Sequence, residues 1–453
     1  MTYILILFLT YVLHLLLKLN WVCTAVVLVF LLVMQHFHRI KGQRFQEARK
    51  RFLDVSLYID TLLYSFLKEQ KIIRAFEDVK STLADGHMKE TVSRAIDHMM
   101  LTFDETEVFV DAMRIIEDEY KCNRIVNAHE FMAHAEYYGG DIKESARILL
   151  KDKSAWERRI LRNIEDRQRM FHQIILSVVT SVIISGIILY LPVLSMDISS
   201  NIIVQILSVA LIVLDDLIIL WGQKFLEVDY LGIDLLPEED KHAKKLEEYK
   251  TYNPAKELRA SILMAVIPAL ASAFLLYTDR QWPAVATMGA ALICLNQHRI
   301  GHRLMKKNLI ADVKSAFPKW LMDLALLIQS ENVQVAIQKS REHIPVILKE
   351  EVNTLVERLD VEPESSDPYH RFLDCLNLPE INAAMGMLYA VSIGNSGNCG
   401  SQIDELITKN LEMLDVADTA RLKDKTAGMY LLFLAPVITA SFKMIVDMAI
   451  FLI

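Results

Sequence analysis

Long apolar stretches occur in two groups along the chain, and the same order of features appears in each half. A pair of apolar stretches is followed by a basic run, a charged block with helical spacing, and another apolar stretch. An apolar helix of about 20 residues is long enough to cross a bilayer. The pattern therefore predicts seven spans in two related modules. The stretches are Tyr3–Leu17, Trp21–Phe37, Gln173–Leu194, Asn201–Trp221, Ala260–Tyr277, Trp282–Leu295 and Gly428–Ile453.

The charged blocks between the spans have the hydrophobic spacing of helices. Apolar residues recur at three- and four-residue intervals from Phe52 to Val79 and again from Phe317 to Glu342. Alternation of polar and β-branched residues is nearly absent. Such a pattern predicts amphipathic helices that bury one face against each other. We expect an all-α polytopic membrane protein in which each block is an antiparallel helical bundle.

Breaks in the pattern divide the chain. Turn-forming residues interrupt the helices at Gly139-Gly140, at Ser330–Asn332, at Pro345, at 361–368 and around Gly394. The predicted segments are a transmembrane hairpin (1–38), a first helical domain (39–172), two spans (173–222), a charged connector (223–258), a second hairpin (259–297), a second helical domain (298–426) and a final span (427–453).

Charge predicts the orientation of these segments. The flanks after Phe37 and after Gln297 are rich in Lys and Arg, whereas Ser195–Ser200 has neither and Thr278–Gln281 has only Arg280. Positive flanks stay on the cytoplasmic side. Both blocks and the connector are therefore expected in the cytoplasm, with the N-terminus inside and the C-terminus outside.

Composition excludes several classes of protein. The chain is 53% hydrophobic and 23% charged, with a net charge of −8 and no basic stripe with interleaved aromatic residues, so nucleic acid is not an expected partner. Its five cysteines are scattered and form no CxxC pair. That spacing argues against a disulfide framework and against a cysteine-based zinc site.

Several short sequences carry a resemblance to a known family. They are Ala316–Leu321, Pro368–Leu373, Asn377–Ile381, Leu388-Tyr389, Ala435-Pro436 and the helix breaks at Gly140–Ile142 and Gly400–Ile403. With a helical block flanked by spans and occurring twice, the chain resembles the type II secretion system F-domain family. It looks like a fusion of the two inner-membrane platform proteins of Tad (tight adherence) pili. Simpler members have two domains and three spans, and this chain departs from that plan.

The resemblance implies a scaffold in the inner or plasma membrane of a bacterial or archaeal cell. Such a protein contacts a cytoplasmic assembly ATPase, pilin subunits, other membrane proteins of the pilus machine and membrane lipids, and it is expected to form a homo-oligomer. It would help to move pilins from the bilayer into the filament, or act in protein secretion. The family offers no catalytic residues, so we expect no enzyme and no cofactor.

The sequence also lacks convincing motifs for nucleotide hydrolysis and for metal binding. The chain has no G-x-x-x-x-G-K-[S/T] phosphate-binding loop. His129 and His134 are five residues apart, which does not align two ligands on a helix. His298 and His302 have the right spacing but lie among Arg299 and Arg303, which disfavour a bound cation. We expect no metal site.

Charged residues within the apolar stretches are the candidate polar site: Asp215, Asp216, Lys443 and Asp447. Each carboxylate costs about 2.5–3.5 kcal/mol near the centre of a span. Asp215 and Asp216 could pair with Lys443 from another span, form a proton or ion path, or lie at the membrane interface. Lys443 and Asp447 are one helical turn apart and could instead neutralise each other.

Two other interpretations stay open. The acidic runs Asp104-Glu105-Thr106-Glu107 and Glu117-Asp118-Glu119 are either solvated faces or a docking surface for a basic ATPase. The alternative function is a secondary transporter or ion-coupled channel that uses Asp215 and Asp216, because internal repeats and midplane carboxylates are common in transporters.

Overall fold

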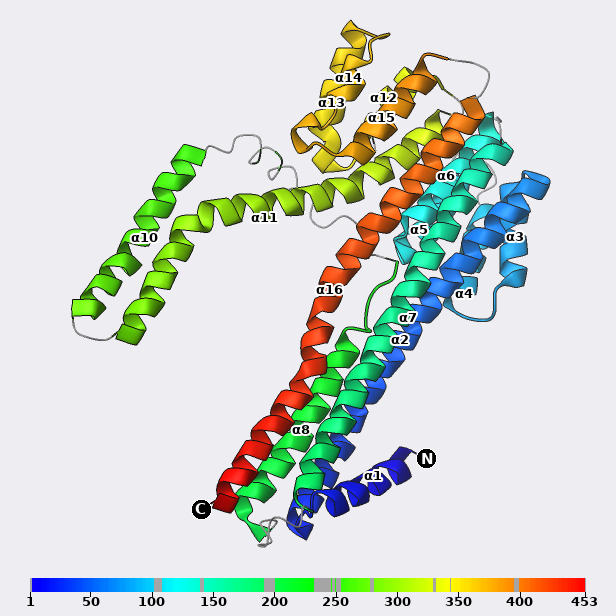
Figure 1. Ribbon diagram of the computed structural model, residues 1–453. Coiled ribbons are helices and arrows are strands. Elements are labelled where there is room, and N and C mark those ends of the chain that lie inside the picture. The colour runs from blue at the N-terminus through cyan, green and yellow to red at the C-terminus, as the bar shows by residue number, and fades with distance from the viewer. Residues whose placement is uncertain are drawn as a thin grey trace. The chain divides into compact units, whose positions relative to one another are not determined.

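The computed structural model describes residues 2–101, 108–138, 142–190, 200–231, 254–277, 281–328, 331–342, 344–394 and 399–452, with Leu246 and Tyr249 (Figure 1). Within these ranges the ordered elements are helices and there is no strand, which confirms the all-α prediction for this part of the chain. The chain divides into two compact units. Unit 1 comprises Met1–Asp234 and Ala420–Ile453, and unit 2 comprises Leu235–Thr419.

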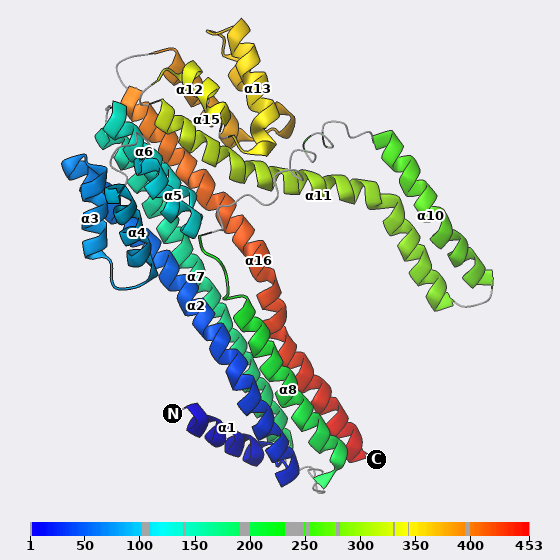
Figure 2. The same ribbon diagram turned by 180° about the vertical axis from the view of Figure 1, so that it is seen from behind.

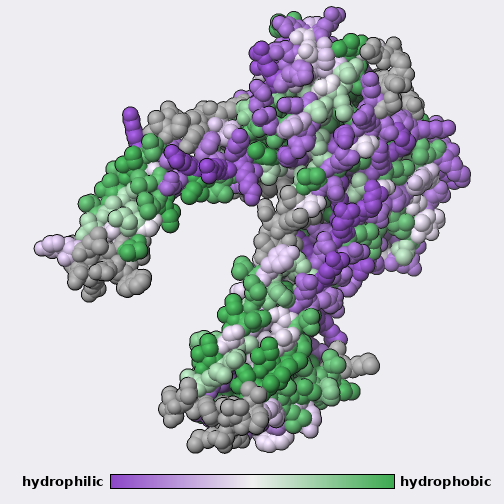
Figure 3. All heavy atoms as spheres, viewed as in Figure 1, coloured by the Kyte–Doolittle hydropathy of each residue, from purple (hydrophilic) through white to green (hydrophobic). Residues whose placement is uncertain are grey.

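Unit 1 contains a bundle of long helices. Its elements are α1 (Thr2–Leu16), α2 (Trp21–Glu69), α3 (Ile72–Thr82), α4 (His87–Leu101), α5 (Val108–Tyr120), α6 (Asn123–Tyr138), α7 (Ile142–Ile188), α8 (Ile202–Lys224) and the last part of α16 (Cys399–Leu452). Figure 2 shows α2, α7, α8 and the end of α16 side by side, as in Figure 1. Below the level of α4, apolar residues cover much of this bundle in Figure 3.

Four of the described helices are long and apolar enough to cross a membrane: α2, α7, α8 and the segment Gly428–Ile450 of α16. A membrane protein is the class that such helices indicate. α1 is a shorter apolar helix. The apolar stretches Ala260–Tyr277 and Trp282–Leu295 lie in α10 and α11 of unit 2. The seven-span topology and the cytoplasmic location of both blocks stay predictions.

The last span packs with the spans of the first half of the chain. Ile174 of α7, Ile218 of α8, and Met429 and Leu432 of α16 form one buried cluster. Gly428 lies against the ring of Phe225, where an added Cβ would come within 2.9 Å of the ring. The two-module prediction had grouped this span with the second block. Its apolar face has its partners on α7 and α8 instead.

The polar part of unit 1 is a second helical bundle, built from α3 to α6 against α2 and α7. Its core holds large fully buried side chains, among them Phe52 and Phe76 at 0% exposure and Trp156 at 1%. The α2 helix ends where Gln70 adopts the left-handed conformation (φ 52°), which lets its N–H bond the carbonyl of Phe66. The turn sends α3 back along α2, so the short helices cover one side of the two long ones (Figure 1).

Two helices run without a break from the apolar bundle into the polar one. α2 has 49 residues and α7 has 47, and each carries an apolar segment at one end and a buried polar-bundle face at the other. Neither has an internal proline. Continuous i→i+4 hydrogen bonding makes each of them a single stiff rod.

Unit 2 is described by itself. It contains α10 (Pro254–Tyr277), α11 (Gln281–Leu327), α12 (Val333–Lys339), η3 (Ser340–Glu342), α13 (Val346–Val361), α14 (Asp367–His370), η4 (Asp374–Leu376), α15 (Pro379–Ser392) and the first part of α16. α10 and α11 pack as a helical pair. The indole of Trp320 stacks on Phe372 at 5.5 Å and donates a hydrogen bond to Ser340 at 2.9 Å. This cluster forms part of the core of the second block.

Candidate functional site

Asp215 lies inside the apolar bundle, where three helices meet. Its side chain is buried at 2% exposure. The Ser181 hydroxyl on α7 donates a hydrogen bond to Asp215 Oδ2 at 3.2 Å, and the Thr439 hydroxyl on α16 lies 3.4 Å from Oδ1. The carboxyl group of α8 thus connects to both neighbouring helices through neutral hydroxyl groups. In the part of the chain that is described, it has no ion-pair partner.

The neighbouring Asp216 has a different environment. Its Oδ1 atom lies 3.2 Å from Nε2 of His38 on α2, and Nδ1 of the same ring lies 2.9 Å from Oε1 of Gln223. The second carboxylate oxygen, Oδ2, is buried and has no hydrogen-bond partner. Because consecutive residues point about 100° apart on a helix, one aspartate faces α2 while the other faces α7 and α16. The cation expected from the sequence was Lys443, and His38 was not predicted.

Lys443 and Asp447 form an ion pair within α16. The Lys443 ammonium lies 2.5 Å from Asp447 Oδ2, and the two side chains are buried at 2% and 1% exposure. The spacing of four residues brings them together on one face. Of the two pairings considered for Lys443, the structure has the local one. Oδ1 of Asp447 has no hydrogen-bond partner. The free-energy cost of removing this carboxylate from water is therefore not fully compensated by hydrogen bonds.

A line of serines on α7 completes the polar interior. Ser177, Ser181 and Ser185 are buried at 5%, 1% and 1% exposure, and Ser177 donates to the carbonyl oxygen of Phe433 at 2.8 Å. Their spacing of four residues puts them on one helix face. This regular spacing within an apolar stretch is a signal in the sequence from which the polar interior could have been predicted. Small polar residues at such positions let helices approach closely and bond across the interface.

The arrangement offers hydrogen bonds and an ion pair within the apolar bundle. A buried carboxyl group between two hydroxyl groups can hold a proton or join helices, and a buried Lys–Asp pair resists separation in a medium of low dielectric constant. No group of three or more His, Cys, Asp or Glu side chains suitable for a metal occurs among the described residues. His302, a histidine considered as a ligand, stacks on Tyr249 with ring centres 5.2 Å apart.

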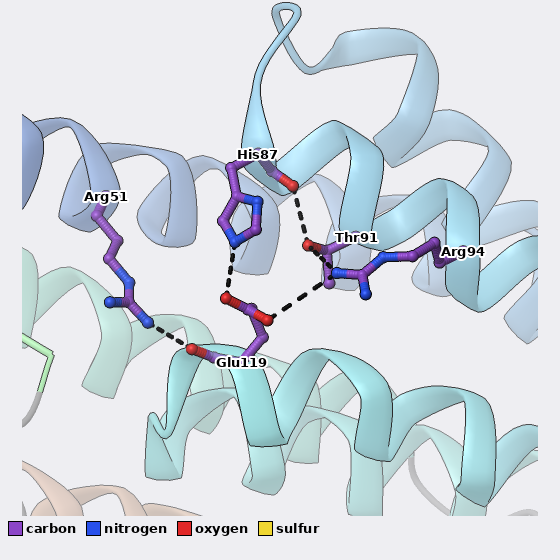
Figure 4. A network of polar contacts seen from close by, with 5 residues as sticks. All are labelled: Arg51, His87, Thr91, Arg94 and Glu119. Atoms are coloured by element: carbon purple, nitrogen blue, oxygen red, sulfur yellow. Dashed lines mark hydrogen bonds and ion pairs between the residues drawn. The ribbon is translucent and has the colours of Figure 1, made fainter.

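The candidate docking surface is only partly described. Asp104, Glu105 and Glu107 lie outside the described residues, and Asp118 is exposed on α5. Glu119 accepts a hydrogen bond from His87 at 2.7 Å and lies 3.9 Å from Arg94 (Figure 4). The hydrogen bond from His87 is the main cause that lowers the pKa of Glu119. The carboxylate of Glu119 therefore interacts with His87 and Arg94 of its own domain.

Glu117 has an inward partner as well. Its Oε1 atom lies 2.7 Å from Nδ1 of His129, whose Nε2 lies 2.7 Å from the Tyr58 hydroxyl. His129 is 1% exposed. A neutral imidazole fits this site, since Nδ1 donates to the carboxylate while Nε2 accepts from the phenol. Of Glu117, Asp118 and Glu119, Asp118 is the most exposed, and the other two are partly buried.

The His129 site predicts a pH dependence of stability. Burial lowers the pKa of His129 below its ordinary value, and the hydrogen bond to Glu117 opposes this with a smaller effect. The unfolded chain therefore binds the proton more readily than the fold does. We expect the free energy of unfolding to be unaffected by this group above about pH 6.5 and to fall as the pH drops below that value.

Thermal unfolding of the full chain in detergent from pH 8 to pH 5 measures this effect. His129→Gln, which does not titrate, is expected to flatten the pH dependence in the upper part of that range. Carboxylate protonation contributes equally to both proteins at lower pH. An identical slope for the two proteins between pH 6.5 and 5.5 would contradict the assignment.

The family resemblance rests on the sequence motifs alone. Several of these motifs have structural roles: Phe317 and Trp320 are buried at 0% exposure, and so is Tyr369. The F-domain assignment stays a prediction. Comparisons of the chain with protein-family models, with curated proteins and with solved structures found no match.

Proposed function

We propose that the chain is a platform protein in the inner membrane of a Tad/type IV-like pilus or type II secretion machine. In this role it couples a cytoplasmic assembly ATPase to the movement of pilin subunits between the bilayer and the filament. The observation that carries the proposal is the continuity of α2 and α7. Each is one helix from the apolar bundle into the polar bundle, so a force on the polar bundle would move the spans.

The local chemistry supports a mechanical role. The polar bundle of unit 1 is held on both long helices by buried side chains and charge pairs, such as Arg124 of α6 with Asp152 of α7 at 2.8 Å. The spans of unit 1 are joined through Asp215, Ser181 and Thr439. A displacement of α7 would therefore reach α8 and α16 through side-chain contacts. We propose that the energy comes from the partner ATPase, since the sequence has no phosphate-binding loop.

A flexible insertion into α2 tests this coupling. We expect a Gly-Gly-Ser-Gly insertion between Gln43 and Arg44 to abolish filament formation, because glycine interrupts the stiff helix between the two bundles. Membrane insertion and pilin synthesis should be unchanged. The measurements are filament counts by electron microscopy and immunoblots of this protein and of pilin.

The same insertion after Asp85, in the turn between α3 and α4, is the matched control and is expected to leave filaments in place. Normal filaments in the α2 variant would rule out transmission through a continuous helix. Normal filaments in a strain that lacks the whole chain would rule out the proposed function itself.

One observation favours the second candidate, an ion-coupled transporter or channel. Asp215 is buried with hydroxyl partners only, in a position where a carboxyl group could bind and release a proton or a cation. Asp215→Asn keeps the shape and removes the charge. Loss of ion flux into liposomes containing this variant, relative to the wild-type chain, would favour transport over the platform function.

A further inference from the structure

The first helix of the chain has an unusual surface. α1 has 15 residues, and no Asp, Glu, Lys or Arg occurs in it. At 1.5 Å per residue it is about 22 Å long, which is shorter than the hydrocarbon core of about 30 Å. A helix of this length and composition reaches only part of the way through a bilayer.

The C-terminal end of α1 is fixed at one end of the spanning bundle. The side chain of Gln205, near the start of α8, donates to the carbonyl oxygen of Lys18 at 2.8 Å and accepts from the N–H of Asn20 at 2.8 Å. An added Cβ on Gly186, near the end of α7, would lie 2.5 Å from Leu16 Cγ. α7 ends and α8 begins here, so the turn between α1 and α2 lies at the end of the bundle that is far from α3 to α6.

The remainder of α1 leaves the bundle. In Figures 1 and 2, α1 crosses the N-terminal end of α2 at a wide angle, and the N-terminus of α1 points away from the other helices. One stripe and the last turn are covered: Thr10 is 4% exposed and Leu13 is 7% exposed, and the partly buried His14 lies with Nδ1 2.8 Å from the Thr24 hydroxyl of α2. Ile4, Leu5 and Phe8, on other faces, are 71%, 67% and 66% exposed. Such a surface cannot lie in water, because exposed apolar area on this scale is unfavourable.

This apolar surface is continuous with the outer faces of the spans. Trp21 and Val22, which begin α2 directly after the turn, are 73% and 70% exposed, and Val29 is 62% exposed. On a spanning helix, exposed apolar side chains such as Val29 face the acyl chains of the lipid, and a tryptophan at the helix end, such as Trp21, lies at the interface with the headgroups. Lipid that covers the start of α2 extends without interruption over the exposed apolar surface of α1.

We propose that α1 is embedded in a single leaflet, the one at the α7–α8 end of the bundle, with lipid acyl chains as its partner on the faces that do not pack on the bundle through Thr10, Leu13 and the last turn. It does not cross the membrane. Its N-terminus then lies on the same side as the turn at Lys18 and Asn20, opposite to the side of the polar bundle. This differs from the predicted topology, in which the N-terminus shares the side of that bundle. The proposal requires the spanning bundle and does not depend on the pilus function.

Labelling of single cysteines determines the side of the N-terminus. In a variant without the five native cysteines, one cysteine is added on a short Gly-Ser extension before Met1. Asn20→Cys and Asp118→Cys, in the same background, are references for the two sides of the membrane. A membrane-impermeant maleimide is applied to spheroplasts before and after permeabilisation. We expect the extension to react before permeabilisation, as Asn20→Cys does. Reaction only afterwards, as for Asp118→Cys, would overturn the proposal.

Spin labels identify what covers α1. Phe8→Cys tests the exposed face and Thr10→Cys is the matched control on the covered stripe, both with the full chain in lipid nanodiscs. We expect the label at position 8 to collide with dissolved oxygen several-fold more often than the label at position 10, since oxygen concentrates in the acyl region. Equally low collision rates would mean that a protein surface, such as a second copy or another helix, covers α1, and would overturn the lipid assignment.

Discussion

Removal of either member of the Lys443–Asp447 pair is expected to destabilise the chain by about 3–5 kcal/mol. Both side chains are almost completely buried in α16, at 2% and 1% exposure. Lys443→Met leaves a carboxylate without its cation, and Asp447→Leu leaves an ammonium group without its anion. An unpaired charge in a medium of low dielectric constant has lost its hydration and gains nothing in return. Unfolding of the purified protein in detergent by denaturant measures the loss.

The double variant Lys443→Met/Asp447→Leu tests whether the loss comes from the unpaired charge. Replacement of a whole buried pair by apolar residues of similar volume is often neutral or stabilising. We therefore expect the double variant to be within about 1 kcal/mol of the wild-type chain, with a coupling energy of several kcal/mol. Single variants as stable as the wild type would show that the pair is hydrated. A double variant as unstable as the singles would show that the site needs polar groups.

Trp156→Ala is expected to destabilise the chain by about 3–5 kcal/mol, the usual range for deletion of a buried aromatic side chain. Trp156 of α7 is 1% exposed. Its ring lies edge-on to Phe52 of α2 with centroids 4.9 Å apart, and the guanidinium of Arg124 lies 5.0 Å from its centroid. The substitution opens a cavity between α2, α6 and α7 and removes a cation–π contact. Thermal unfolding followed by near-UV circular dichroism reports the change.

Trp221→Ala is the matched control for this substitution. Trp221 is on α8 and is 66% exposed, so its removal creates no internal cavity and is expected to change stability by less than about 0.5 kcal/mol. The same chemical change should therefore give very different results at the two positions. Equal effects would contradict the packing of Trp156 at the centre of the polar bundle.

Local features of the sequence predicted the secondary structure well. The hydrophobic spacing predicted helices, and helices are what the described residues form. The helix break predicted at Pro345 lies directly before the first residue of α13. The loop expected at 361–368 falls between Val361, which ends α13, and Asp367, which begins α14. These signals act over a few residues of chain, through backbone conformation and helical periodicity. They need no information about distant segments.

Charge pairs were predictable only when both members lie on one helix. The contact of Lys443 with Asp447 follows from their spacing of four residues. The contact of Asp216 with His38 joins residues 178 positions apart, and no periodicity relates them. The same holds for Asp215, whose partners Ser181 and Thr439 come from two other helices. Each of these contacts depends on which faces of α2, α7, α8 and α16 meet.

The sequence alone determined that the described part of the chain is helical, that apolar helices alternate with polar blocks, and that a few charged residues lie within the apolar helices. Periodicity and hydropathy are properties of neighbouring residues, so they can be read along the chain. Only the tertiary structure decided that the last span packs on α7 and α8, that Asp215 and Asp216 have different partners, and that α1 leaves the bundle. Helices with similar apolar faces can pair in several ways, and the choice depends on side-chain shape, such as the close approach of Leu16 to Gly186, which becomes defined only when the helices meet.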